Sequence, residues 1–506
     1  MTTGFGREAN ERLLHELLGT EQTEAALSGS DAVDWLSAMA EGRISAEELT
    51  RACLARMARW EKHLNAMISL APDAPETARA CDRLRAAGVV KPLLGLPVVV
   101  KDNIDVAGFP TTVGAAALQD GRPKRDAFLV SLLREAGAVI LGKTNLSEYA
   151  SDGMTESSLI GQTRNPYDLT RTPGGSSGGS GAATAAEYAA VAVGTDGVNS
   201  VRSPASANAL VGLRPTRGLV SRRGVCPCSE TQDMCGTLTR SARDAALLLG
   251  VLARHDPLDP ASVTVPVRDY LAGLRDGALA GRHLVLLRNN CGDHPAVTAM
   301  VRRTAARLRR LGATVEETED AVLDAGRLLR EDNVIRYEQK ANIDRWLSDP
   351  ENGYRVRSLQ EYLDSGLIPA PVAATLRAEL TPQYLDRDAY RRRLDRIAED
   401  RRYVVELMEA RGIDAFCYPS QTIPVAPVGA PGGQAGRTGI LASALGLPAV
   451  SFPGGYTEPT ADAPVGVPMG MELLGAPFSE QTLLGMTHDL ERAEPVRKIP
   501  PLERLR

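Results

Sequence analysis

Residues 174–203 read GGSSGGSGAATAAEYAAVAVGTDGVNSVRS, and this stretch decides the fold class of the chain. Its small residues from 177 to 187 favour a helix, and the apolar run at 189–193 predicts a strand directly after it. One glycine-rich loop with serines precedes the helix, and a second follows the strand. Both loops lie where a strand meets a turn or a helix, which is the edge where open α/β sheets place their functional sites.

The sequence before this stretch continues the alternation of strands and helices. Residues 97–100 predict a short buried strand, residues 127–136 a helix and residues 138–141 another strand. Strands that alternate with helices indicate an α/β fold with a largely parallel sheet that is covered by helices on both faces.

Two further regions set the expected domain organisation. Residues 1–75 read as an N-terminal helical arm, in which Ser45 and Glu48 form a capping box, and residues 76–506 as the catalytic domain. The region at about 290–410 is richer in charge and in long helical patterns. Because it breaks the strand–helix rhythm, we interpret it as a divergent helical insert over the sheet.

Composition excludes several classes of partner. The chain has 506 residues, of which 58 are basic and 63 acidic, so its formal net charge is −5. A charge this close to neutral produces no field that favours nucleic acid or an anionic membrane. No apolar stretch has the length of a membrane span, and the first residues lack the apolar core of a secretory signal. We therefore expect a small-molecule partner, no nucleic acid and no membrane.

The cysteines indicate the compartment. Seven of them, an odd number, are spread over a long chain, which argues against a disulfide framework and for the cytoplasm. Cys226, Cys228 and Cys235 are close in sequence, but no histidine or fourth cysteine stands at a metal-ligand spacing. We interpret them as free thiols and expect neither a metal nor another cofactor.

The two serine-bearing loops lack a nearby histidine. A serine nucleophile needs a base, and the six histidines all lie outside residues 64–254. The loops also lack the lysine of a phosphate-binding loop and the Gly-x-Ser-x-Gly elbow of the Ser–His–Asp hydrolases. Lys101, at the end of the apolar run, is the natural base in this stretch, because burial there lowers the pKa of a lysine.

Three segments together resemble the amidase signature family: Lys101-Asp102-Asn103, the stretch RTPGGSSGGS at 171–180 and the stretch GTDGVNSVR at 194–202. The resemblance runs from about 40 to 490 and is weakest between 290 and 410. It implies one α/β/α domain with a large mixed, mostly parallel sheet that is covered by helices.

The resemblance also implies roles for residues of this chain. The family's catalytic triad falls on Lys101, Ser176 and Ser200. Ser200 would be the nucleophile, and Ser176 would relay its proton to Lys101 from a loop with a cis peptide bond between Gly175 and Ser176. The role of Asp102 stays open, because this carboxylate could pair with a basic group and be structural rather than take part in the reaction.

Support for the nucleophile would come from its own turn. The backbone N–H groups of Gly197, Val198 and Asn199 would form the oxyanion hole. The commonest family pattern has two glycines directly before the nucleophile, so Val198 and Asn199 depart from it. Asp196 and Arg202 flank the turn, and we expect them to fix it as a buried ion pair.

The sequence says little about the substrate. Gly153 and Met154 match the family's substrate-facing loop, and Ser177 either contacts the substrate or caps the following helix. In the insert, the polar side chains of residues 333 and 336–338 are interpreted as a solvated helix face.

The resulting expectation is a serine amidohydrolase that cleaves a carboxamide through an acyl-serine. Two related activities remain open, namely acyl transfer to an amine by an amide synthase and ammonia release by an amidotransferase subunit, because the family includes a subunit of glutamyl-tRNA amidotransferase. A scaffold without activity is the non-enzymatic alternative. A homodimer is among the assemblies that the sequence leaves open.

Overall fold

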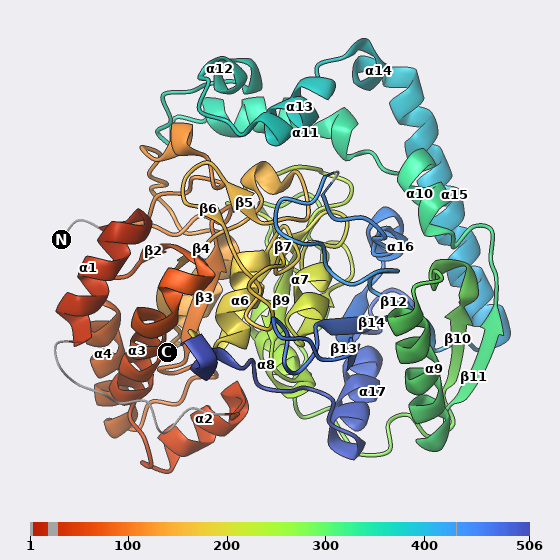
Figure 1. Cartoon of the computed structure of the whole chain (residues 1–506), viewed down its shortest axis with the longest axis horizontal. Helices are drawn as coiled ribbons and strands as arrows, with labels where there is room; N and C mark the ends of the chain where they lie inside the picture. The colour runs from red at the N-terminus through yellow and green to blue at the C-terminus, as the bar shows by residue number, and fades with distance from the viewer. Residues whose placement is uncertain (1–3, 19–28, 432, 506) are drawn as a thin grey trace.

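A large twisted sheet runs through the computed structural model, which describes residues 4–18, 29–431 and 433–505 (Figure 1). In the described residues twelve strands form it. Their order across the sheet is β1 (Gly4–Phe5), β2 (Met67–Leu70), β4 (Val139–Thr144), β3 (Pro97–Lys101), β7 (Val191–Asp196), β9 (Met234–Thr239), β8 (Val211–Arg214), β13 (Ala449–Tyr456), β14 (Pro468–Leu474), β12 (Ala415–Pro419), β10 (His283–Leu287) and β11 (Thr314–Thr318). A separate small hairpin joins β5 (Glu156–Ser157) and β6 (Gly161–Gln162).

Helices cover this sheet, so the predicted α/β domain with a large mixed sheet is confirmed. They are α1 (Gly6–Leu18), α2 (Ala32–Ala40), α3 (Ala46–Leu64), α4 (Ala74–Ala86), α5 (Phe128–Glu135), α6 (Gly178–Ala185), α7 (Arg202–Ala207), α8 (Ala242–Leu252), α9 (Pro295–Arg310), α10 (Ala325–Glu331), α11 (Ile335–Ser348), α12 (Leu359–Asp364), α13 (Ala370–Ala378), α14 (Pro382–Leu385), α15 (Arg387–Arg411), α16 (Ile440–Leu445) and α17 (Glu480–Ala493). In the part of the chain that the structure describes, none of the helices is long and apolar enough to cross a membrane.

The directions of the strands refine the expectation of a mostly parallel sheet. Parallel pairing occurs in two blocks, β4–β3–β7 and β12–β10–β11. The neighbours between and outside these blocks pair antiparallel. The antiparallel centre arises because β8 and β9, and likewise β13 and β14, are consecutive along the chain and fold back on each other, a pattern that strand–helix alternation does not reveal.

The structure confirms the elements predicted around the two glycine-rich loops. The strand at 97–100 lies in β3, the helix at 127–136 contains α5, and the strand at 138–141 overlaps β4. The helix at 177–187 contains α6, and the strand at 189–193 overlaps β7. The local patterns are therefore reliable where strands and helices alternate with short connections.

The N-terminal region contributes to the sheet as well as to the helices. The predicted capping box begins α3, because Ser45 Oγ accepts from the N–H of Glu48 and the carboxylate of Glu48 accepts from the N–H of Ser45. Within the predicted arm at 1–75, β1 and β2 form one edge of the sheet. The parts of this arm at 1–3 and 19–28 lie outside the described residues.

The segment predicted as a helical insert at about 290–410 begins with part of the sheet. Helix α9 links β10 to β11, and these strands pair in parallel, so the strand–helix rhythm continues to Thr318. Beyond it, α10 to α15 run along the upper and right rim of the molecule in Figure 1 before the chain enters β12.

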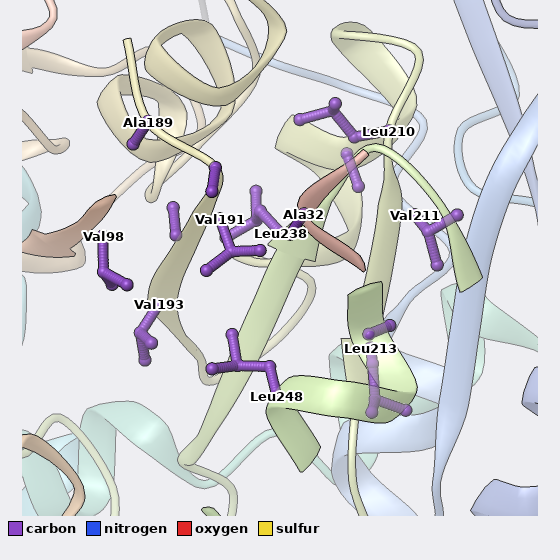
Figure 2. Packing of buried hydrophobic residues seen from close by; sticks show 14 of the residues in the cluster. Ala32, Val98, Ala189, Val191, Val193, Leu210, Val211, Leu213, Leu238 and Leu248 are labelled. Carbon is purple, nitrogen blue, oxygen red and sulfur yellow. The ribbon is translucent and has the colours of Figure 1, made fainter. Parts of the chain in front are cut away.

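The middle of the sheet is apolar on both faces (Figure 2). Val98 of β3, Val193 of β7, Leu213 of β8 and Leu238 of β9 are fully buried, and Leu248 of α8 belongs to the same cluster. A strand that is covered on both faces has no solvent-facing positions, which explains the uninterrupted apolar run of β3. In β3 the polar position is thereby left to its last residue, Lys101.

Close packing at the start of α6 holds the first glycine-rich loop. A Cβ at Gly179 would lie 2.4 Å from the carbonyl oxygen of Asn145 and 2.8 Å from that of Ala66. The N–H of Gly179 donates to the same Asn145 oxygen at 3.2 Å. Only glycine therefore lets the helix approach the end of β4 this closely.

Replacing Gly179 by alanine should destabilise the fold. Because the new methyl group meets backbone rather than a movable side chain, we expect Gly179→Ala to lower the free energy of unfolding by about 1–3 kcal/mol. Urea denaturation followed by circular dichroism measures the change. Gly250→Ala in α8 is the matched control, since the nearest atom to its added Cβ is 3.7 Å away, and it should stabilise by up to about 1 kcal/mol. Equal effects of the two substitutions would contradict this account.

Candidate active site

The two serine-bearing loops and the end of β3 meet at one edge of the sheet. Lys101 is the last residue of β3, Ser176 precedes α6, and Ser200 lies between β7 and α7. Because β3 and β7 are parallel neighbours, their carboxyl ends lie side by side. Ser176 and Ser200 both line a cavity of about 110 Å³ at this edge.

Lys101 forms hydrogen bonds to two hydroxyl groups in the floor of this site. Its Nζ lies 2.7 Å from Ser176 Oγ and 2.8 Å from Thr195 Oγ1. Thr195 Oγ1 also accepts from Asn103 Nδ2 at 3.0 Å. Since both acceptor positions of Thr195 are used, the lone pair of a neutral Lys101 is directed to Ser176.

A comparison with a second buried lysine shows what is unusual about Lys101. Both Lys101 and Lys143 are fully buried. Lys143 Nζ forms an ion pair with Asp102 at 3.0 Å, which answers the open question about that carboxylate. Lys101 has no carboxylate within 4.0 Å in the described part of the chain. Burial lowers the pKa of Lys101 to about 8, so a substantial neutral fraction exists at mildly alkaline pH.

Ser176 lies in the loop whose geometry the resemblance implies. The peptide bond between Gly175 and Ser176 is cis, as expected. The carbonyl oxygen of Ser176 accepts from the N–H of Ser147 at 3.1 Å. This bond fixes the backbone of the residue whose hydroxyl contacts Lys101.

The turn before Ser200 has free backbone donors. Gly197, Val198 and Ser200 line the cavity, whereas Asn199 does not. Neither Val198 nor Asn199 has a positive φ, so the departure from the two-glycine pattern requires no left-handed backbone. The N–H groups of residues 197–200 donate to no acceptor within the described ranges 4–18, 29–431 and 433–505. Donors of this kind can bind an oxyanion.

Asn199 packs away from the cavity, against the segment before α16. A Cβ at Gly439 would lie 2.3 Å from the Cβ of Asn199. Asn199 is fully buried, and its amide finds no hydrogen-bond partner among the described residues. Its side chain therefore fills space behind the turn and does not narrow the cavity.

A buried ion network holds the turn to the sheet. Asp196 lies 2.9 Å from Arg202 and 3.0 Å from Arg214, and Arg202 lies 2.7 Å from Glu472 of β14. Asp196 also accepts from the N–H of Val201 at 3.1 Å. Burial opposes ionisation of Asp196, but the charges of Arg202 and Arg214 outweigh it and lower its pKa to about 2. The predicted pairing of Asp196 with Arg202 is part of this larger network.

The predicted substrate contacts lie outside the cavity wall. Ser177 neither caps α6 nor lines the cavity, because its hydroxyl donates to the carbonyl oxygen of Thr195 at 3.1 Å and ties α6 to β7. Gly153 and Met154 are also absent from the lining, whereas Ser151 is part of it. The loop turns away after Ser151, since the N–H of Met154 binds the side chain of Asp152 at 2.8 Å.

The remaining wall comes from segments that the sequence did not connect to the site. One side is provided by residues 335, 336 and 339 of α11 and by residue 333 just before it. Of the residues expected on a solvated helix face, 333 and 336 therefore line the cavity. Asp233, Glu379 and Arg437 complete the wall from three further segments. Burial raises the pKa of Asp233 to about 6 and that of Glu379 to about 8. Only the folded chain brings these groups together.

The chain is similar to known proteins over most of its length. A model of the protein family described as Amidase matches residues 48–484. The chain is 35% identical over 481 residues to a glutamyl-tRNA(Gln) amidotransferase subunit from Moorella thermoacetica, a match that covers 89% of this chain and 93% of that protein. It is 36% identical over 491 residues to the corresponding subunit from Nitratidesulfovibrio vulgaris, covering 92% and 96%.

Solved structures are similar over nearly the whole chain. The native peptide amidase from Stenotrophomonas maltophilia superposes with a TM-score of 0.84 at 34% identity and covers 94% of this chain and 99% of its own. An amidase family protein from Bacillus anthracis superposes with a TM-score of 0.86 at 27% identity, with 97% of both chains covered.

Breaking the ion network should destabilise the protein strongly. Asp196→Asn leaves Arg214 buried without a carboxylate, and removing one partner of a buried pair costs about 3–5 kcal/mol. Urea denaturation at pH 7 measures this loss. Glu11→Gln is the control, because the ion pair of Glu11 with Arg7 is exposed and its removal should leave the midpoint nearly unchanged. A loss for Asp196→Asn as small as that of the control would show that the network does not hold the turn.

Proposed function

The chain belongs to the amidase family, and we propose that it is a serine amidohydrolase that uses Ser200, Ser176 and Lys101 as its catalytic triad. The observation that carries the proposal is the 2.7 Å hydrogen bond between a buried, unpaired lysine and Ser176 beside a cavity that Ser200 also lines. In the described part of the chain, no carboxylate lies close enough to hold this lysine in its charged form.

The triad would move one proton along a short path. Ser200 Oγ attacks the amide carbon while its proton passes to Ser176, and the proton of Ser176 passes to the neutral amine of Lys101. The tetrahedral intermediate then collapses, the C–N bond breaks, and the proton returns through Ser176 to the leaving nitrogen. Water repeats the sequence on the acyl-serine and releases the acid.

The turn before Ser200 would stabilise the developing oxyanion. We assign this role to the backbone N–H groups of Gly197 and Val198, which line the cavity, together with that of Ser200, and no longer to Asn199, which packs behind the turn. The free state of these donors supports the assignment, since a donor with an internal partner would have to break that bond during the reaction.

The size of the cavity favours a small substrate. Its volume of about 110 Å³ is below the roughly 300–1,000 Å³ of pockets for drug-sized ligands. We propose a compact amide of about amino-acid size. We also propose that the protein acts in the cytoplasm, because all seven cysteines are unpaired thiols. Burial raises the pKa of every one of them above its ordinary value.

A second candidate function is suggested by the sequence relatives. The amidotransferase subunits from Moorella and Nitratidesulfovibrio are 35% and 36% identical to this chain, over 89% and 92% of its length. In that role, the protein would use the same triad but pass ammonia to a partner protein. Two observations would favour this candidate over a stand-alone hydrolase. The tagged protein, purified from its own cells, would carry partner chains in stoichiometric amounts, and its glutaminase activity would depend on those partners.

Covalent labelling tests the nucleophile directly. We expect a fluorophosphonate to label the protein once, at Ser200, as identified by peptide mass spectrometry, and we expect Ser200→Ala to abolish the label. Ser203→Ala is the matched control, because Ser203 is buried three residues further on and its hydroxyl has no partner in the described chain. It should keep the label. An adduct at any other serine would refute the assignment.

The pH dependence tests the base. Only neutral Lys101 accepts a proton, and its pKa is lowered to about 8, so kcat/KM should rise tenfold per pH unit below about pH 8 and level off above it. Lys101→Ala should lower kcat/KM by about 10³-fold and remove this rise. Lys124→Ala, which removes an exposed lysine that does not line the cavity, should keep the profile. A flat profile in the unmodified enzyme would contradict the role of Lys101.

A further inference from the structure

Two arginines line the cavity without a carboxylate partner. Arg437 lies in the loop before α16, and Arg336 lies on α11. Both line the same cavity as Ser176 and Ser200. Their positive charges therefore act on whatever the nucleophile binds.

Arg437 is half-buried and makes no side-chain hydrogen bond or ion pair with any described residue. The charge of Asp152 acts on it from more than 4.0 Å away. Its guanidinium also remains charged at neutral pH, because arginine has the highest pKa of the side chains even where burial lowers it. An unpaired charge in a partly dry wall is unfavourable unless a ligand compensates it.

Arg336 lines the same cavity from α11 and is exposed. Its guanidinium lies 5.6 Å from the ring centre of Tyr384 and donates to the hydroxyl of Tyr384 at 3.1 Å. No described carboxylate lies within 4.0 Å of it, although its charge opposes the rise in the pKa of Glu379. Because water already solvates Arg336, it can assist a more buried cation but does not require a ligand itself.

The acidic groups of the cavity do not neutralise these arginines. Asp233 directs a carboxylate oxygen to the N–H groups of Cys228 and Ser229 at 2.7 Å each, so it is already committed. Glu379 is buried, and one of its oxygens has no partner in the described chain. Because burial raises its pKa to about 8, Glu379 is mostly protonated at neutral pH and can donate a hydrogen bond.

We propose that this cavity selects amides that carry a carboxylate, with Arg437 as the principal residue that binds the carboxylate and Arg336 as the second. The proposal rests on the proposed amidohydrolase function and names its substrate class. A carboxylate fits the planar fork of a guanidinium through two parallel hydrogen bonds. The small cavity further favours an anion of three heavy atoms over a bulkier phosphate.

A kinetic comparison within each variant tests this proposal. The probes are two amides of similar length, glutaramate with a terminal carboxylate and hexanamide with a terminal methyl group. We expect the unmodified enzyme to prefer glutaramate by at least about 100-fold in kcat/KM, and Arg437→Met to lower this ratio at least tenfold, mainly through KM. Arg437→Lys should restore part of the ratio, because it keeps the charge but loses the fork.

A matched control distinguishes the loss of a positive charge inside the cavity from the loss of one positive charge anywhere on the protein. Arg392 on α15 is exposed and does not line the cavity, so Arg392→Met should leave the glutaramate-to-hexanamide ratio unchanged. If Arg392→Met and Arg437→Met change the ratio equally, or if the unmodified enzyme has no preference, the proposed carboxylate subsite is wrong.

Binding without turnover distinguishes this inference from the proposed function. Isothermal titration of Ser200→Ala protein with glutarate and with hexanoate should show tighter binding of glutarate, and Arg437→Met added to this variant should remove the difference. If glutarate binds in this way but no amide is cleaved and Ser200 is not labelled, the subsite stands and the amidohydrolase function fails. If amides are cleaved through Ser200 but glutarate binds no better than hexanoate, the function stands and the subsite fails.

Discussion

The burial of one lysine without a counter-charge is the constraint on which the rest of the site depends. Lys101 ends a strand that is apolar on both faces, so its amine cannot reach bulk water. A charged amine in such a place is costly, and the fold does not relieve that cost with a carboxylate as it does for Lys143. The neutral amine is favoured instead, and a neutral amine can accept a proton.

A second set of charges shows the opposite strategy a short distance away. Asp196, Arg202, Arg214 and Glu472 are equally buried, but each has partners of opposite charge. Asp196 stays ionised because its pKa is lowered to about 2, and it holds the turn that presents Ser200 through the N–H of Val201. The same sheet edge thus contains two kinds of buried charged group. Asp196 and its partners are paired and hold the backbone in place, whereas Lys101 is unpaired and its charged form is destabilised. The separation is required, because a carboxylate moved from one to the other would fix Lys101 in its charged form.

The sequence predicted the parts of this site that lie close together along the chain. Strand β3, the two glycine-rich loops and the cis bond before Ser176 follow from local patterns and from the resemblance. The wall of the cavity did not follow, because Arg437 and Glu379 are brought to Ser200 only by packing of remote segments. Ser177 was expected either to contact the substrate or to cap α6, yet its hydroxyl donates to the carbonyl oxygen of Thr195. No local signal distinguishes these uses of a serine. The antiparallel centre of the sheet was missed for a similar reason, since alternation of elements does not fix the direction of neighbouring strands.

The close packing around Gly439 limits how this site can change during evolution. A Cβ on Gly439 would lie 2.3 Å from the Cβ of Asn199, 2.9 Å from Arg202 Nη1 and 3.0 Å from the carbonyl oxygen of Val198. Glycine at 199 would remove the first of these overlaps but neither of the other two. A lineage can therefore exchange Asn199 for the glycine of the commoner turn, whereas position 439 stays closed to any side chain as long as the turn and its ion network are kept.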